Sequence, residues 1–172
     1  MRLLFSILGL MALAGCADTG AVMKRQSSDN TYYLHGDVDA NSYKSIIDVL
    51  SKNQRKPVTF VVDSNGGWIT GIENAMDAMR AHGQVHWIVP ENGGCYSACA
   101  LLGISAAKID GTLNFHSPSS SYKNSDYMLT GRNEQIIQKI VSYGYNRLLV
   151  ERLLNSVNIY SKLKFKDGVL QK

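Results

Sequence analysis

The stretch that most constrains the fold is 58–118, where short apolar segments alternate with helix-like segments and glycine turns. Residues 58–62 form a nearly continuous apolar run, which is typical of a strand covered on both faces. Residues 69–82 then carry apolar side chains at helical spacing. A strand over 84–89, a buried helix over 97–107 and a strand over 109–115 complete the pattern. Alternating units of this kind connect parallel strands, so the sequence predicts an α/β fold with a mostly parallel sheet and flanking helices.

The flanking sequence extends this pattern on both sides. Residues 31–35 are short and aromatic and predict a strand, and 40–53 have the apolar period of an amphipathic helix. Residues 117–131 are rich in Ser, Tyr and Asn and predict an exposed loop. Residues 133–154 predict a long amphipathic helix, bent near Gly144. Residues 155–172 mix apolar side chains with lysines and favour no single element.

Three motifs fall where predicted strands end and helices begin, at 64–67, 93–99 and 115–118. In a parallel sheet this is the functional edge. A serine hydroxyl needs a base to accept its proton, and the oxyanion that forms needs donors already in place. Ser97 opens a predicted helix, and His116 ends the next strand. The residues therefore predict an acyl-transfer site with Ser97 as nucleophile and His116 as general base.

Both side chains also have ordinary structural explanations. Serine is a favoured N-cap, which accounts for Ser97 when it is considered alone. A single histidine at the end of a strand is usually structural or solvated. The catalytic interpretation therefore depends on Ser97, His116 and the Gly66-Gly67 turn occurring together.

The motifs resemble those of the Clp protease proteolytic subunit and its relatives in the crotonase-like superfamily. The shared features are a Ser-x-Gly-Gly turn at 64–67, a Gly-x-x-Ser at 94–97 and a His-x-Pro at 116–118. The similarity covers roughly residues 32–118 and is closer to secreted Clp-like bacterial proteins with Cys-x-Ser-x-Cys, as at 95–99. It implies a Clp/crotonase-like fold, Ser97 and His116 as catalytic residues, and oxyanion-hole N–H groups from Gly67 and Ala98. Rings are typical of the family, which implies a homo-oligomer.

One departure from the family concerns the residue that orients the histidine. Clp-type triads contain an Asp about fifty residues after the histidine, and residues 154–158 hold no carboxylate. Four residues are candidates for this role: Asp126, Asn155, Asn158 and Asp167. Without such a partner the imidazole spends time in the wrong tautomer, and the rate falls.

Cys95 and Cys99 have three interpretations. A disulfide is favoured, because Cα atoms four residues apart around a helix start can fall within the roughly 4.4–6.8 Å that a bridge requires. Such a bridge would clamp the turn that presents Ser97. A zinc pair lacks a second pair of His or Cys ligands, and redox or nucleophilic chemistry at Cys99 is the third alternative.

The N-terminal region predicts export and lipidation. Arg2 precedes an apolar run that is too short to span a bilayer, so residues 1–15 are expected to be a signal peptide. Residues 13–16 (Leu-Ala-Gly-Cys) resemble the lipobox of bacterial lipoproteins, which makes Cys16 the acylated N-terminus. By resemblance to enterobacterial sorting rules, Ala17 after the cysteine then implies the outer membrane, facing the periplasm. Residues 16–30 are small and polar and predict a flexible tether, followed by one domain over 31–172.

The formal net charge of +4, to which Arg2 contributes one, is too small to indicate nucleic-acid binding. The expected partners are the lipid bilayer and a peptide or protein substrate, and no cofactor or metal is expected. The sequence thus predicts a membrane-anchored periplasmic serine peptidase. The alternative is an inactive Clp-like scaffold that binds peptides or a partner protein. Acyl-CoA chemistry of the crotonase type would leave the pairing of Ser97 with His116 unexplained.

Overall fold

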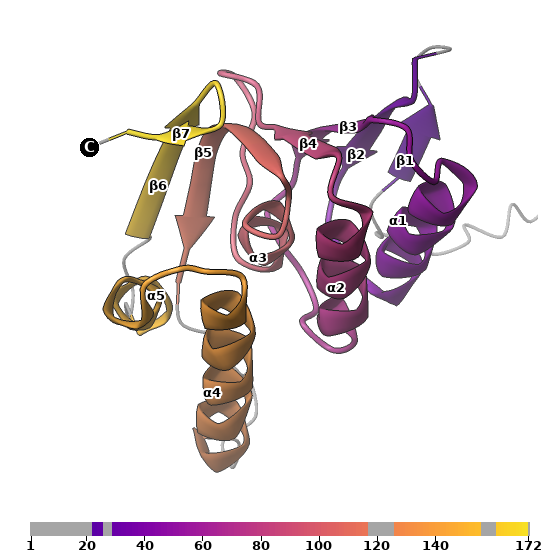
Figure 1. Ribbon diagram of the computed structural model, residues 1–172. Helices are drawn as coiled ribbons and strands as arrows, with labels where there is room; N and C mark the ends of the chain where they lie inside the picture. The colour runs from indigo at the N-terminus through magenta and orange to yellow at the C-terminus, as the bar shows by residue number, and fades with distance from the viewer. Residues whose placement is uncertain (1–21, 26–28, 117–125, 156–160, 172) are drawn as a thin grey trace, which may run out of the picture.

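Seven strands follow one another across a single sheet in chain order (Figure 1). The computed structural model describes residues 22–25, 29–116, 126–155 and 161–171. The strands are β1 (Val22–Arg25), β2 (Thr31–His35), β3 (Val58–Asp63), β4 (Val85–Ile88), β5 (Lys108–Phe115), β6 (Ser161–Lys166) and β7 (Val169–Leu170). The helices are α1 (Ala40–Lys52), α2 (Ile72–His82), α3 (Ala98–Gly103), α4 (Asp126–Ser142) and α5 (Arg147–Leu154).

The sheet is parallel at its centre and antiparallel at its sides. Strands β2, β3, β4 and β5 pair in parallel, whereas β1, β6 and β7 join by antiparallel pairing. The α/β class predicted from the sequence is therefore confirmed, but the sheet is mixed. The chain beyond α5 contributes two strands, β6 and β7, that the sequence pattern left unassigned.

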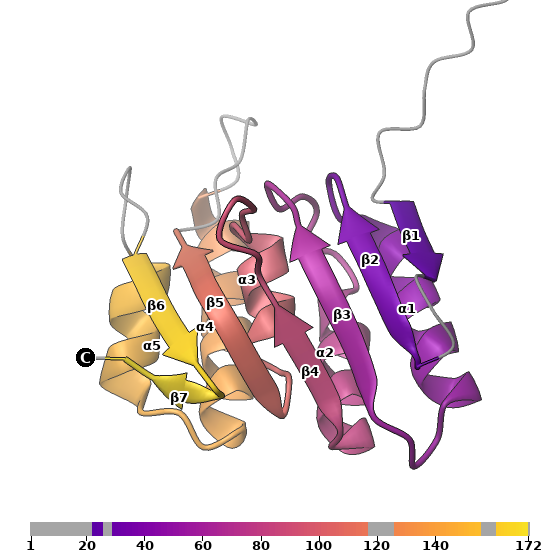
Figure 2. The ribbon, with the colours of Figure 1, turned by 90° about the horizontal axis from the view of Figure 1, so that it is seen from above.

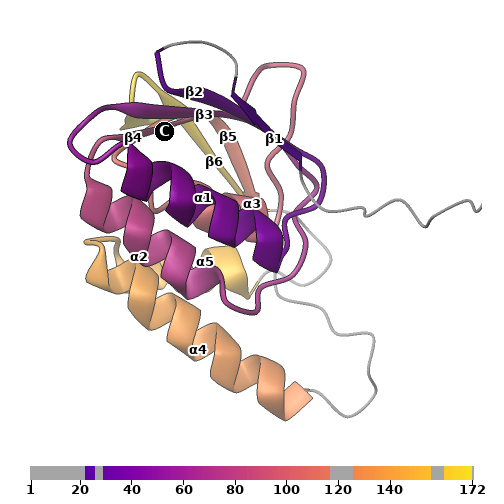
Figure 3. The same cartoon turned by 90° about the vertical axis from the view of Figure 1, so that its right-hand side faces the viewer.

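The helices cover only one face of the sheet (Figures 2 and 3). Right-handed crossovers between strands placed in chain order put each connecting helix on the same side. The expectation that residues 58–62 are covered on both faces was therefore wrong. Val58, Phe60 and Val62 are fully buried, whereas Thr59 and Val61, which alternate with them, are only partly buried.

The core forms between the helices and the inward side chains of the central strands. Phe60 and Trp87 are fully buried neighbours, with ring centroids 5.7 Å apart. Gly103 lets α3 approach the sheet closely, because a Cβ there would lie 2.8 Å from both the Trp87 indole nitrogen and the Leu113 side chain. All six residues of α3 are buried. This packing fixes the helix that follows Ser97.

Several predicted boundaries were wrong. The buried helix ends at Gly103 rather than at residue 107, and the long helix expected over 133–154 is two helices. The first of them begins at Asp126, inside the predicted loop. The change of direction expected near Gly144 is confirmed, because Gly144, with φ +98°, lies in the break between them. The apolar period alone did not mark the ends of these helices.

The predicted tether is shorter than expected, because β1 pairs with β2 and belongs to the sheet. Residues 1–21, which include Cys16, lie outside the described residues, as do 26–28. Within the described ranges, no helix is long and apolar enough to cross a membrane.

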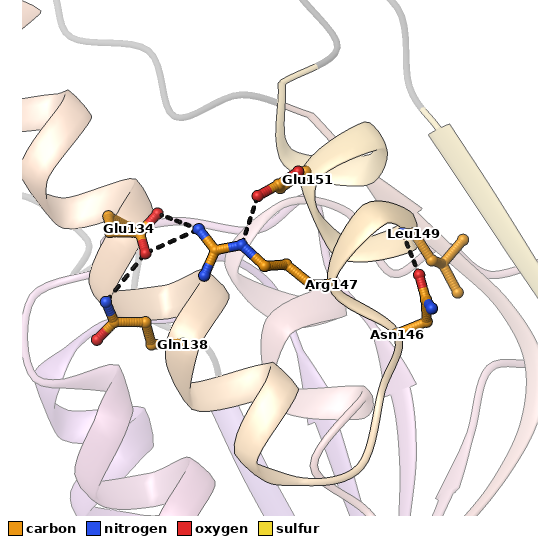
Figure 4. Close-up of polar contacts among 6 residues, drawn as sticks. All are labelled: Glu134, Gln138, Asn146, Arg147, Leu149 and Glu151. Atoms are coloured by element: carbon orange, nitrogen blue, oxygen red, sulfur yellow. Dashed lines mark hydrogen bonds and ion pairs between the residues drawn. The ribbon is translucent and has the colours of Figure 1, made fainter.

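Arg147 holds α5 against α4 (Figure 4). Its guanidinium donates to both carboxylate oxygens of Glu134 at 3.0 Å and to Glu151 at 2.7 Å. Hydrogen bonds from Gln138 and then from Arg147 lower the pKa of Glu134. Asn146 caps α5 by accepting from the N–H of Leu149 at 3.2 Å. These polar contacts join α4 to α5, which precedes β6 in the chain.

Asp39 offers a test of local stability. It caps α1 by accepting from the N–H of Ser42 at 2.8 Å, which holds the pKa of its carboxyl below the usual value. Asp39→Ala is expected to lower the free energy of unfolding by about 1 kcal/mol in urea denaturation at neutral pH. A carboxyl group whose pKa is lowered by folding stabilises the folded state at pH values above its unfolded-state pKa. This stabilisation is lost as the pH falls through the folded-state pKa.

The difference between wild type and Asp39→Ala should therefore shrink in acid, and Asp39→Asn should retain most of the stability at neutral pH. Equal stability of the wild type and Asp39→Ala at neutral pH would contradict the capping role.

Candidate functional site

Residues 94–97 extend the sheet beyond β4 and lie between the chain segments that leave β3 and β5. On one side, Ser64 N–H donates to Gly94 O at 2.8 Å, and Tyr96 N–H donates to Ser64 O at 3.1 Å. On the other side, Asn114 N–H donates to Cys95 O, and Ser97 N–H donates to Asn114 O, both at 2.9 Å. The backbone that leads to Ser97 is thus held by hydrogen bonds on both sides.

Ser97 has a backbone conformation that is rare for a residue with a side chain. Its φ is +53° and its ψ is −119°. Sparsely populated conformations cost about 1–3 kcal/mol and persist only where surrounding contacts enforce them, which occurs often at functional sites. Ser97 is the N-cap residue of α3, yet its side chain makes no capping hydrogen bond. The ordinary N-cap explanation therefore does not account for this serine, whose side chain is partly exposed.

The Gly66-Gly67 turn lies directly against Ser97. A Cβ on Gly66 would lie 2.7 Å from both the Ser97 Cβ and the Tyr96 carbonyl oxygen, and 3.4 Å from the Ala98 nitrogen. On Gly67, with φ +146°, it would lie 2.0 Å from the Val38 carbonyl oxygen. Both glycines are required by close approach of the backbone.

Gly67 and Ala98 have N–H groups suited to binding an anion. Val38 N–H donates to Gly66 O at 2.7 Å, and Trp68 N–H donates to Val38 O at 3.0 Å, so the Gly67 N–H points away from Val38. Ala98 is the first residue of α3, where backbone N–H groups have no acceptor within the helix. Among the described hydrogen bonds none uses either N–H. Both groups lie where the Gly66-Gly67 turn meets Ser97.

His116 follows β5 directly and is partly buried. Asn114, whose carbonyl accepts from Ser97, is only two residues before it. Tyr96 and Asn114 also form a parallel bridge, so the chain segments carrying Ser97 and His116 leave the sheet side by side. The structure thus brings the four predicted site residues Ser97, His116, Gly67 and Ala98 to one edge of the sheet.

Asp167 does not belong to this edge. It lies in the turn between β6 and β7, and the next residue, Gly168, donates its N–H to Ile109 O at 3.1 Å. Ile109 is near the start of β5, whereas His116 follows its end, about 20 Å away at the usual strand rise. Asp167 was therefore a wrong candidate for orienting His116, because β6 carries the tail away from the site.

The other three candidates for orienting His116 lie in different parts of the chain. Asn155 is the exposed C-cap residue of α5, and Asp126 begins α4 with a side chain outside the described residues. Asn158 also lies outside them, within 156–160. The first residue after that segment, Ser161, pairs with Phe115 next to His116. The described chain therefore resumes beside the histidine at Ser161, and a role for Asn158 stays a prediction.

Cys95 and Cys99 flank Ser97 and are joined through their sulfur atoms, with Cα atoms 5.3 Å apart. Both residues are fully buried. The bridge spans the turn from the end of the sheet extension to the first turn of α3. In this arrangement neither sulfur is a zinc ligand or a nucleophile, and the described residues hold no cluster of three metal-ligating side chains.

Asp63, Ser64 and Asn114 support the site and were not assigned these roles by the sequence. Asp63 accepts from Gly94 N–H at 2.9 Å, and Ser64 Oγ accepts from Gly66 N–H at 3.1 Å. Asn114, only 5% exposed, donates its side-chain amide to Cys95 O at 3.3 Å. The available signal was Asn114, a polar residue between the apolar Leu113 and Phe115.

A groove of about 860 Å³ opens beside the site on the face of the sheet without helices. Its lining includes Tyr96 and Asn114 near the serine, and lysines of β6. Asp110 lies farther along the groove, and its Oδ2 is hydrogen-bonded to Nε2 of His86 at 2.6 Å. Burial opposes ionisation of Asp110, but the bonds from His86 and from the Gly168 N–H lower its pKa. The volume is within the range of ligand-binding pockets.

Comparison with known proteins does not assign the chain to a family. No protein-family model matches it, and a search of curated proteins finds no significant match. The similarity to Clp-type proteases therefore remains a sequence-based expectation.

Gly67→Ala is expected to disrupt the site more than Gly71→Ala. Both glycines have positive φ, but a Cβ on Gly71 meets nothing within 4 Å, whereas one on Gly67 collides with Val38. Gly71→Ala should cost roughly 1 kcal/mol of backbone strain, and Gly67→Ala clearly more. Urea denaturation of the two variants measures the difference, and equal losses would contradict the close approach described here.

The Cys95–Cys99 bridge can be tested by intact mass after alkylation without reductant. The expected result for exported protein is no alkylation at these two residues, and modification of both would contradict the bridge. The Cys95→Ala/Cys99→Ala variant should be less stable by up to about 3 kcal/mol, because a link across a short loop restricts the unfolded chain only modestly.

Proposed function

We propose that the protein is a Clp-like serine peptidase in which Ser97 and His116 hydrolyse peptide bonds. The observation that carries the proposal is the strained backbone of Ser97. The side chain of this serine makes no capping hydrogen bond, and the residue lies against the Gly66-Gly67 turn. Hydrogen bonds on both sides of residues 94–97 maintain this conformation. The N–H groups of Gly67 and Ala98, which donate in none of the described hydrogen bonds, adjoin the serine. A purely structural N-cap would need none of these features.

The chemistry follows from this arrangement. Ser97 Oγ attacks the carbonyl carbon of the peptide while the His116 imidazole accepts the hydroxyl proton. The N–H groups of Gly67 and Ala98 stabilise the oxyanion that forms. The C–N bond then breaks, and His116 returns the proton to the leaving amine. Water, deprotonated by His116, hydrolyses the acyl ester and regenerates Ser97. The groove beside Tyr96 offers space for the peptide.

The proposed cellular setting comes from the sequence. Acylation of Cys16 would anchor the domain to the bacterial outer membrane on its periplasmic side. Anchoring by several acyl chains is stable, since each buried CH₂ contributes about 0.8 kcal/mol.

The second candidate function is an inactive scaffold that binds peptides or a partner protein. The position of Asp167 favours this alternative, because the tail supplies no carboxylate to the histidine. A binding scaffold would keep the groove and the Gly66-Gly67 turn but would not hydrolyse peptides.

Labelling with a soluble fluorophosphonate separates the two functions. The peptidase predicts covalent labelling that Ser97→Ala abolishes and that His116→Ala slows by at least about 10³-fold. Ser51→Ala is the matched control, because Ser51 is exposed on α1 and its hydroxyl donates only to Asp48 O. Labelling that is absent, or that survives Ser97→Ala, would reject the peptidase.

A further inference from the structure

The chain enters the sheet at the same edge as the candidate site. Strand β1 is antiparallel to β2, and its first residue, Val22, pairs with His35 at the carboxyl end of β2. The turns after β2 and β3 are joined at this edge by the hydrogen bond from Val38 N–H to Gly66 O. Figure 2 shows β1 starting at the end of the sheet toward which β2 and β3 point.

The distance from this edge to the proposed anchor is short. Only residues 17–21 separate Cys16 from Val22. Six Cα–Cα steps, even fully extended, span about 20 Å. A lipid on Cys16 would therefore keep the start of β1, and the sheet edge that holds Ser97, close to the bilayer surface. If β1 were absent, a flexible tether over residues 16–30 would leave the domain free to rotate relative to the bilayer.

Trp68 projects from this edge. Its side chain is 74% exposed, although its backbone is held by Val38 O and by the hydroxyl of Tyr43. Tyr43 is buried, which raises the pKa of its phenol and keeps it a hydrogen-bond donor. The other tryptophan, Trp87, is fully buried. An exposed tryptophan on a fixed backbone suits the membrane–water interface, where the indole is favourably placed.

We propose that the carboxyl edge of the sheet faces the lipid surface that holds Cys16. The connection reaches about 20 Å from the surface to the start of β1, and three inter-strand spacings add about 15 Å, so substrates of the Ser97 site are peptide segments within about 35 Å of that surface. The inference rests on the proposed peptidase and its lipid anchor. Exposed charges of both signs lie on this edge, with the carboxylates of Asp37 and Asp63 after β2 and at the end of β3 and the ammonium of Lys162 at the start of β6, so they largely offset one another. Orientation depends instead on the short connection and on Trp68.

Energy transfer from tryptophan to a dansyl-labelled phosphatidylethanolamine tests the orientation. Full-length lipidated protein is placed in neutral phosphatidylcholine vesicles containing the probe. Most of the transfer should come from Trp68 and be lost in Trp68→Phe, which retains Trp87. The matched variant Trp68→Phe/Gln84→Trp moves the donor to an exposed site before β4, at the opposite edge of the sheet. That edge lies about 20 Å away along the strands.

Transfer from residue 84 is expected to be several-fold weaker than transfer from Trp68. Equal or stronger transfer from residue 84 would overturn the proposed orientation, whatever the activity of the protein. Urea denaturation of each variant checks that the fold is retained.

A lipid-linked fluorophosphonate on spacers of increasing length tests the reach of Ser97. Wild-type protein on vesicles should be labelled by the shortest spacers, and Ser97→Ala by none. Labelling only through spacers much longer than about 35 Å would overturn the proposal. Failure of the soluble fluorophosphonate as well would reject the peptidase, while the energy-transfer comparison would still decide the orientation.

Discussion

The site depends on the hydrogen bonds that hold residues 94–97 between Ser64 and Asn114. They extend the sheet past the end of β4 and set the direction in which the chain turns into α3. Without them, the unfavourable backbone conformation of Ser97 would relax, since strain persists only where its surroundings enforce it. Four backbone hydrogen bonds, each contributing about 1 kcal/mol, are comparable to that strain.

Close approach of backbone segments is the second constraint, and it explains the glycines. Gly66 brings the turn after β3 against Ser97, and Gly67 brings it against Val38. Gly103 acts similarly at the other end of α3, where the helix meets Trp87. The chain that carries the serine is therefore positioned by contacts at both ends of α3. This is the pre-organisation that a nucleophile and an oxyanion site require.

The peptidase proposal and the membrane-facing orientation share one geometric origin. Parallel strands bring their carboxyl ends to a common edge, so the turn after β3, Ser97 and His116 meet there. Antiparallel pairing of β1 brings the N-terminal connection to the same edge. A lipid-anchored enzyme built in this way would act on segments near its own membrane. Rotation of the domain on a long tether would remove that preference.

The sequence by itself determined the α/β alternation, the elements from β2 to β5 and the residues gathered at their carboxyl edge. These are local signals, namely apolar period, glycine turns and helix starts, and they need no knowledge of distant contacts. Tertiary structure alone decided that β1 and β6 complete the sheet, that one face lacks helices, and that Asp167 lies at the far end of β5. The order and direction of strand pairing made these choices, because backbone hydrogen bonds across a sheet leave little trace in either partner's sequence. Right-handed crossovers between strands in that order then placed the helices on one face.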